Sequence, residues 1–165
     1  LTKVLLKMSS YKEDFMKEAV NAALKGMTNN EGGPFGCVIV KDGKVIGRGN
    51  NKVTSTNDPT AHAEITAIRD ACKNLDSFQL DGCEIYTSCE PCPMCLGAIY
   101  WARPDKVYYG SNQSDAANIG FDDEFIYKEI PLPYAKRSIP FEQLSRDIAL
   151  VPFQKWAEKV DKTEY

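Results

Sequence analysis

Two short motifs in the middle of the chain constrain its fold more than any other feature. One is a His-x-Glu motif at residues 62–64, and the other is a Pro-Cys-x-x-Cys motif at residues 91–95. Imidazole nitrogen and thiolate sulfur bind zinc well, and a catalytic zinc takes three protein ligands and keeps its fourth position open. The fold must therefore bring these two segments together where a small molecule can reach them.

Both motifs are expected at the starts of helices. Strong helix formers fill residues 61–73, and Asp58 or Thr60 can cap that helix. Prolines on both sides of Cys92 flank the start of a second helix, which runs to about Trp101, because proline is tolerated in a first helical turn. The electropositive start of a helix also favours thiolates, which suits the two cysteines.

We predict that His62, Cys92 and Cys95 hold one zinc ion per chain. Cys92 and Cys95 are three residues apart on a helix start, so their side chains lie near one another. Zinc lowers the pKa of a bound water toward ~7, and Glu64 is the expected proton carrier beside it. Residues 62 and 64 point about 200° apart on an ideal helix, so the site must wrap around the helix end.

A second interpretation makes the metal structural. Cys89 forms a further Cys-x-x-Cys pair with Cys92, and a site that also used Cys95 and His62 would be closed to water. Such a module would bind a partner and would have no use for Glu64. The other three cysteines are expected to be small buried hydrophobes: Cys37, Cys72 and Cys83.

The rest of the sequence predicts a single domain in which strands and helices alternate. The expected elements are a helix at 10–30, strands at 35–40 and 44–49, a helix at 61–73, a strand at 83–87, a helix ending near 101 and a strand at 106–110. Ser9 or Ser10 would cap the first helix, and Asp42-Gly43 predicts a hairpin turn. This order implies a mixed sheet covered by helices, followed by a less regular C-terminal third.

The composition narrows the kinds of partner. A net charge of −3 and a pI of about 5.3 disfavour binding to a long nucleic-acid backbone, because such binding needs clustered Lys and Arg. No run approaches the roughly 18 apolar residues of a membrane span. The apolar run within residues 1–10 is too short for a signal peptide, and Met8 is a candidate native start. Six cysteines without an export signal favour a reduced, cytoplasmic protein.

With these motifs the chain resembles the cytidine-deaminase superfamily, whose H-x-E…P-C-x-x-C signature they match. The resemblance spans nearly the whole chain. It implies an α/β fold, a three-layer α/β/α domain around a central five-stranded mixed sheet. It also implies zinc-dependent hydrolytic deamination of a nucleobase, in which Glu64 moves the protons.

Within that superfamily the chain is similar to the bacterial guanine deaminases. The matching stretches are residues 32–36, 50–51, 57–64, 88–101, 120–123 and 164–165. The similarity implies that guanine is hydrolysed to xanthine and ammonia. It also implies a homodimer whose C-terminal segments are exchanged, so that Tyr165 closes the site of the other subunit. Tyr165 equally fits an ordinary disordered chain end.

The same resemblance implies roles for further residues. Asn51 would hydrogen-bond the purine, as an amide with both a donor and an acceptor can, and the backbone of Ala63 would also contact it. Phe35 and Trp101 would line the pocket, since aromatic faces stack on bases. Asp123 would bind the purine and pass a proton to the departing amine. Simpler interpretations stay open. Asn51 could be a turn residue at the end of a strand, and Phe35 and Trp101 could be core residues. Asp123 could cap a helix at 124–129.

Other substrates also stay open. A tRNA adenosine deaminase shares residues 58–64 and the Pro-Cys-x-Met-Cys stretch. The acidic pI argues against tRNA, as do the scattered basic residues Lys136, Arg137 and Arg146. Cytosine, cytidine or an aminotriazine would require no change in the zinc chemistry.

Overall fold

The structure is a computed structural model that describes residues 10–165. The candidate start at Met8 and the cap at Ser9 therefore lie outside the described residues. The chain forms two compact units, of which the first ends at Asp122 and the second spans Asp123–Tyr165. Both predicted metal motifs belong to the first unit.

A mixed sheet of four strands forms the centre of the first unit. The strands are β1 (Gly36–Lys41), β2 (Lys44–Asn50), β3 (Cys83–Cys89) and β4 (Lys106–Ser111). They lie in the order β2-β1-β3-β4, in which β1 is antiparallel to both neighbours and β3 is parallel to β4. The predicted turn between β1 and β2 is confirmed, because Asp42 and Gly43 have φ of 50° and 73°, both positive as a type I′ turn requires.

The resemblance implied five strands, whereas the described residues form four. After β4, the side chain of Asn112 accepts a hydrogen bond from the Asp115 backbone, and the Asp115 side chain accepts one from the Asn112 backbone. This capping box starts α5 (Gln113–Asn118). The later regular elements of the described chain are all helical, so the mixed sheet is confirmed without a fifth strand.

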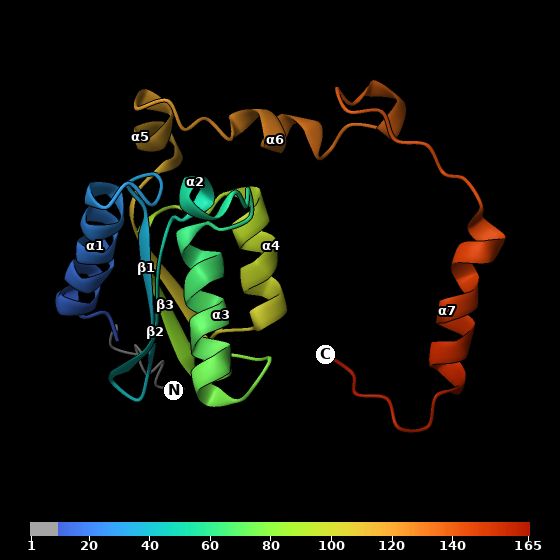
Figure 1. Ribbon diagram of the computed structural model, residues 1–165, viewed down its shortest axis with the longest axis horizontal. Coiled ribbons are helices and arrows are strands. Elements are labelled where there is room, and N and C mark those ends of the chain that lie inside the picture. The colour runs from blue at the N-terminus through green and yellow to red at the C-terminus, as the bar shows by residue number, and fades with distance from the viewer. Residues whose placement is uncertain (1–9) are drawn as a thin grey trace, which may run out of the picture. The chain divides into compact units, whose positions relative to one another are not determined.

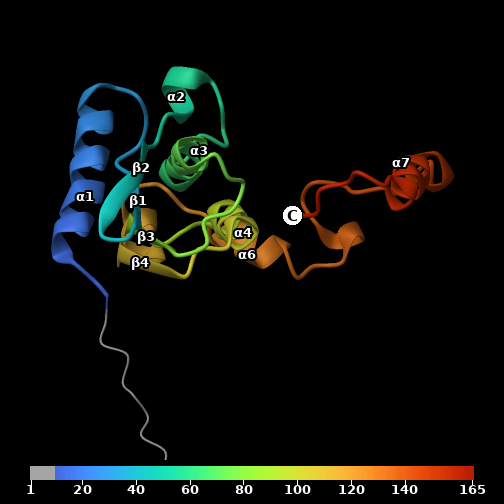
Figure 2. The same cartoon turned by 90° about the horizontal axis from the view of Figure 1, so that it is seen from below.

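Helices cover both faces of the sheet (Figures 1 and 2). α1 (Glu13–Thr28) lies on one face, and α3 (Ala63–Leu75) and α4 (Pro93–Ala102) lie on the other. A short helix, α2 (Val53–Thr56), precedes α3 and is not predicted by the sequence pattern. The three-layer α/β/α arrangement is therefore present in the first unit.

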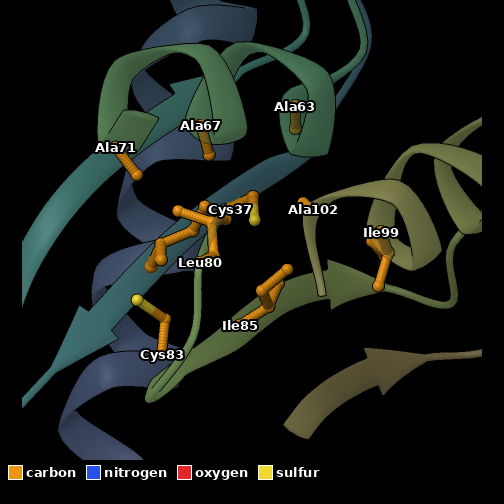
Figure 3. Close-up of a cluster of buried hydrophobic side chains, with 10 residues drawn as sticks. Cys37, Ala63, Ala67, Ala71, Leu80, Cys83, Ile85, Ile99 and Ala102 are labelled. Carbon is orange, nitrogen blue, oxygen red and sulfur yellow. The ribbon is translucent and has the colours of Figure 1, made fainter. Parts of the chain in front are cut away.

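Side chains of β1 and β3 alternate between two apolar clusters, one on each face of the sheet. The cluster beneath α3 and α4 (Figure 3) includes Cys37, Ile39, Cys83, Ile85, Ala63, Ala67 and Ala71. The alanines let α3 approach so closely that a Cβ on Gly49 of β2 would lie 2.3 Å from the Ala63 carbonyl oxygen. The start of α3 is thus held against the sheet. The prediction of buried cysteines is confirmed for Cys37 and Cys83, and Cys72 packs against the same cluster.

The predicted serine cap of the first helix is wrong. α1 begins at Glu13, and Lys12 occupies its N-cap position without a capping side-chain hydrogen bond. The Ser10 hydroxyl instead hydrogen-bonds Glu84 and Tyr108 on the sheet. The Ser10 hydroxyl therefore makes a tertiary contact with the sheet and does not form the helix cap that the local pattern predicts.

The predicted cap of α3 is also wrong. The Asp58 carboxylate accepts hydrogen bonds from the backbone N–H and the hydroxyl of Thr60, which closes a local turn. His62 occupies the N-cap position of α3. The metal motif consequently begins one residue before the helix.

The second unit is helical and has no buried residue of its own. Its elements are α6 (Glu124–Glu129), the 3-10 turn η1 (Tyr134–Lys136) and α7 (Arg146–Glu158). The Arg137 guanidinium lies 4.6 Å from the ring centroid of Tyr134 and donates a hydrogen bond to the Ile130 carbonyl. Large apolar side chains stay exposed along α7, including Ile148, Phe153 and Trp156. No helix in the described part of the chain has the length and apolar character needed to cross a membrane.

Candidate metal centre and active site

The two metal motifs meet where α3 and α4 begin. His62 and Cys92 are the N-cap residues of these helices, with φ/ψ of −69°/161° and −66°/167°. Because His62 has an extended backbone, its side chain need not point away from Glu64 as it would within a helix. Cys95 follows in the first turn of α4, and Ala63 is the first residue of α3, where backbone N–H groups have no acceptor within the helix.

The three predicted ligands form one compact cluster. The Nδ1 atom of His62 lies 3.5 Å from the Sγ atoms of both Cys92 and Cys95. The donor atoms of all three residues lie within 4.8 Å of one another. Around a tetrahedral zinc, nitrogen at ~2.0 Å and sulfur at ~2.3 Å would be roughly 3.5 Å apart. The observed spacing therefore fits a single zinc ion.

The pKa values of the two thiols diverge in the absence of a cation. A hydrogen bond with Cys95 lowers the pKa of Cys92 to about 4, and the same bond together with burial raises the pKa of Cys95 well above its usual value. A metal ion binds cysteine as thiolate, so metal binding would release the proton that Cys95 keeps. The pair is therefore suited to a cation that both sulfurs can bind.

Cys89 is not part of this cluster. Its thiol donates to the backbone carbonyl of Asn112 over 3.8 Å, and the group that could hold a metal among the described residues has three members. The four-ligand structural site considered above would need Cys89 as the fourth ligand. The geometry thus favours three protein donors and an open fourth position.

Glu64 lies beside the cluster and is only 6% exposed. The Thr87 hydroxyl donates to Oε1 and the Cys95 thiol donates to Oε2, each over 3.3 Å. Burial raises the pKa of the Glu64 carboxyl above its usual value. A carboxyl with a raised pKa is better suited to take up a proton and release it again, as a general acid and base must.

Asn51 presents its amide with a defined orientation. Its Oδ1 accepts from the backbone N–H groups of Gly33 and Val53, over 3.3 and 3.1 Å, and the residue is 6% exposed. A Cβ on Gly32 would lie 2.2 Å from Oδ1, so this approach requires glycine. Because Oδ1 is occupied, the NH2 end of the amide is the part that can donate to a ligand.

Backbone hydrogen bonds tie Phe35 and Asn51 to the segment that leads into α3. The Asn51 N–H donates to the Phe35 carbonyl over 3.0 Å, and the Lys52 N–H donates to the Ala61 carbonyl over 2.9 Å. The Phe35 ring packs against the core beneath α3 and meets the Phe121 ring edge-on, with centroids 4.9 Å apart. Phe35 is therefore partly a core residue.

The roles predicted for Trp101, Asp123 and Tyr165 stay predictions. Trp101 is 63% exposed near the end of α4, roughly 13 Å along the helix axis from Cys92 at about 1.5 Å per residue. Asp123 is the N-cap residue of α6, and Tyr165 is 71% exposed; both belong to the second unit.

Comparison with known proteins assigns the family. A family profile described as "Cytidine and deoxycytidylate deaminase zinc-binding region" matches residues 9–111, which include both metal motifs. The chain belongs to this deaminase family. The matched region of the family runs from the start of α1 to the end of β4, so it holds the whole sheet and the cluster.

Relatives within this deaminase family differ in how much of the chain they match. Guanine deaminase of Bacillus subtilis (strain 168) is 60% identical over 153 residues, which are 93% of this chain and 98% of the relative. The X-ray structure of guanine deaminase from Bacillus subtilis has a TM-score of 0.91 at 59% identity, over 94% of this chain and 99% of that one. The tRNA-specific adenosine deaminase of Aquifex aeolicus (strain VF5) is 42% identical over 100 residues, 61% of this chain and 66% of the relative.

Two residues of this deaminase-family site escape prediction from the sequence. Thr87 touches Glu64 from the middle of β3, and Phe121 packs on Phe35 from a loop. One sequence signal points to Thr87. The alternation of side chains along the strand places residue 87 on the buried face, where a hydroxyl is unexpected. For Phe121 no local pattern distinguishes it from an ordinary exposed aromatic residue.

Proposed function

We propose that this chain catalyses the zinc-dependent hydrolytic deamination of guanine, which yields xanthine and ammonia. The observation that carries the proposal is the cluster of three donors with a buried carboxyl beside it, Glu64. The relative named guanine deaminase, 60% identical over 93% of the chain, supports guanine as the base. One water molecule is consumed for each ammonia released.

The metal site would hold one zinc ion per chain through His62, Cys92 and Cys95. When bound, zinc supplies a Lewis acid that acidifies water. Glu64 takes a proton from the attacking water and delivers it to the ring nitrogen next to the carbon under attack. Its raised pKa suits this exchange, because the carboxyl must both accept and release a proton during one turnover.

The purine would be bound beside the metal by residues at the end of the β1–β2 hairpin. The amide NH2 of Asn51 would donate to an acceptor on the purine edge, since its oxygen is used by the backbone. The N–H groups at the start of α3, near Ala63, would contact the ring, and Phe35 would cover it. Asp123 would bind the purine and pass a proton to the departing amine.

The enzyme would act as a homodimer in the cytoplasm, where thiols stay reduced. The second unit has no buried residue, although α7 carries several large apolar side chains. A unit of this kind gains stability by packing against another surface. We infer that the C-terminal segments are exchanged between two copies, so that Tyr165 closes the site of the other subunit, and that Trp101 helps to line the purine pocket.

An ammonia-release screen tests the substrate. Guanine, adenine, cytosine, their nucleosides and aminotriazines are each incubated with the zinc-loaded protein, and guanine should be turned over fastest. Glu64→Gln should keep about one equivalent of zinc and lose about 10²- to 10⁴-fold in rate. The surface variant Glu18→Gln is the matched control and should stay active. Strong turnover of another base without guanine turnover would overturn the substrate assignment.

A tRNA adenosine deaminase is the second candidate, favoured by the 42% identical relative of that name. That similarity covers 61% of the chain, whereas the similarity to guanine deaminase covers 93%. A tRNA substrate also needs a positive surface to bind phosphates, and the net charge is −3. Inosine formation in tRNA by this protein, measured beside guanine turnover, would reverse the order of the two candidates.

A further inference from the structure

We propose that Thr87 is a positioning residue for Glu64, whose hydroxyl holds the carboxylate in its orientation beside the metal site during turnover. The inference deepens the proposed function and rests on it for the role of Glu64. The bond itself joins the Thr87 Oγ1 atom to Glu64 Oε1 over 3.3 Å.

The position of Thr87 in the sheet is one that favours an apolar residue. It lies in β3, directly opposite Cys37 of β1 and Tyr109 of β4 in the strand register. Its strand face also carries Cys83 and Ile85, both fully buried in the cluster beneath α3 (Figure 3). Thr87 is itself 2% exposed, and a valine of the same shape would fit such a face without a polar atom.

The buried hydroxyl has one partner, and that partner is Glu64. Among the described residues, the Thr87 side chain makes no other hydrogen bond. A buried hydroxyl without a hydrogen-bond partner lowers the stability of the folded protein. The hydroxyl therefore serves the carboxyl of Glu64 alone.

Metal binding makes this hydroxyl more important for Glu64. Without metal, the carboxyl accepts side-chain hydrogen bonds from two donors, the thiol of Cys95 and the hydroxyl of Thr87. As a metal ligand Cys95 is a thiolate and has no proton to donate. Thr87 is then the remaining side-chain donor to the carboxylate among the described residues.

The sheet side of Glu64 offers no substitute for this donor. Cys37 and Cys89, which flank Thr87 on this face, are thiols of 0% and 6% exposure, and burial raises the pKa of both. A thiol is a weak donor compared with a hydroxyl. Loss of the Thr87 hydroxyl would thus leave the carboxylate with its own backbone N–H as the remaining donor, and no side chain of the sheet would fix its orientation.

The test compares Thr87→Val, which keeps the shape and removes the hydroxyl, with Thr87→Ser, which keeps the hydroxyl. Ile85→Val is the matched packing control, because it removes one methyl group from the same strand face without touching Glu64. For each zinc-loaded protein we would measure zinc content, melting temperature, kcat and KM for guanine, and the crystal structure around Glu64.

Thr87→Val should retain about one equivalent of zinc and lower kcat by about 10- to 100-fold with KM changed less than about twofold, as for a misplaced catalytic group. Its crystal structure should show the Glu64 carboxylate rotated or in two orientations. Thr87→Ser should recover most of kcat. Ile85→Val should lower the melting temperature and leave kcat unchanged.

An unchanged kcat in Thr87→Val, or a Glu64 carboxylate that keeps its orientation, would overturn the proposal. A loss that Thr87→Ser does not recover, or an equal loss in Ile85→Val, would assign Thr87 to packing alone. If the unaltered protein does not turn over guanine, the proposed function fails. The orientation of Glu64 in the crystals of the variants still decides the role of Thr87 in that case.

Discussion

At the scale of single residues, Glu64 combines a chemical advantage with a cost in stability. Its carboxyl is buried beside two thiols, and burial raises its pKa. In the metal-free protein the ionised form is therefore disfavoured on folding. Burial, which raises the pKa and so suits the proposed proton exchange, also opposes the folded state once the carboxyl is ionised in the unfolded chain.

The metal-free Glu64→Gln variant should consequently melt at a higher temperature than the unaltered metal-free protein at pH 7. Below the unfolded pKa of about 4.3 the carboxyl is protonated in both states and the two melting temperatures should converge. Above it the unfolded state loses its proton first, so the unaltered protein loses stability as pH rises toward the folded pKa. Thermal unfolding from pH 4 to pH 8 measures this. A difference that does not change with pH would contradict the pKa assignment.

At the scale of elements, the site depends on how closely α3 lies on the sheet. The helix presents Ala63, Ala67 and Ala71 to β1 and β2, and Gly49 faces the first turn. His62 and Glu64 both belong to that turn or its cap. The close contact therefore sets the position of a candidate metal ligand and of the proposed proton carrier together.

Gly49→Ala should destabilise the protein and impair the site. Its new Cβ would lie 2.3 Å from the Ala63 carbonyl oxygen and 2.4 Å from the Ala67 nitrogen, so the helix must move, at a cost of about 1–3 kcal/mol. We expect a lower free energy of unfolding in urea and weaker zinc binding.

Gly97→Ala is the matched control in α4. A Cβ at Gly97 meets nothing within 4 Å, and alanine in a helix interior is favoured over glycine by about 0.5–1 kcal/mol. The variant should be as stable as the unaltered protein or more so, with zinc content unchanged. Equal effects of the two substitutions would mean that the close packing of α3 does not matter for the site.

At the scale of the whole molecule, the candidate metal site joins two helices that the chain connects only through β3. His62 belongs to the start of α3, whereas Cys92 and Cys95 belong to the start of α4. A cation bound by all three would hold both helix starts and would bind the folded chain in preference to the unfolded one. The first unit should therefore depend on zinc for part of its stability.

Zinc removal by a chelator should lower the melting temperature, and added zinc should restore it. Free zinc at about 100 times its Kd adds about 2.7 kcal/mol to the free energy of unfolding. His62→Ala should melt at the same temperature with and without zinc. Calorimetry at fixed protein concentration measures both. If the melting temperature of the unaltered protein is the same with and without zinc, this cluster does not hold a resident metal.

The proposed exchange of C-terminal segments can be tested by complementation. Glu64→Gln and a chain that lacks Tyr165 should each be weakly active alone. If Tyr165 acts on the other subunit, mixed dimers contain one site with an intact Glu64 and an intact segment from the other chain. Unfolding and refolding the two variants together should then restore guanine turnover. A mixture no more active than the separate variants, or a monomeric mass by light scattering, would contradict the exchange.

The sequence alone determined the candidate ligand types, the helices at whose starts they lie, and the order of the four strands and of α1, α3 and α4 in the first unit, but not the short helices α2 and α5. These follow from local signals: the two motifs, the prolines around Cys92, and the alternation in the strands. Local signals failed at Ser10, where a contact with the sheet removed the expected helix cap.

Only the tertiary structure decided the geometry of the site. It placed His62 at the N-cap of α3 with an extended backbone, which removed the 200° conflict with Glu64. It also brought Thr87 under Glu64 from 23 positions along the chain. A contact between residues so far apart depends on strand register and on how closely a helix packs on the sheet, and neither is encoded in the neighbouring residues of the chain.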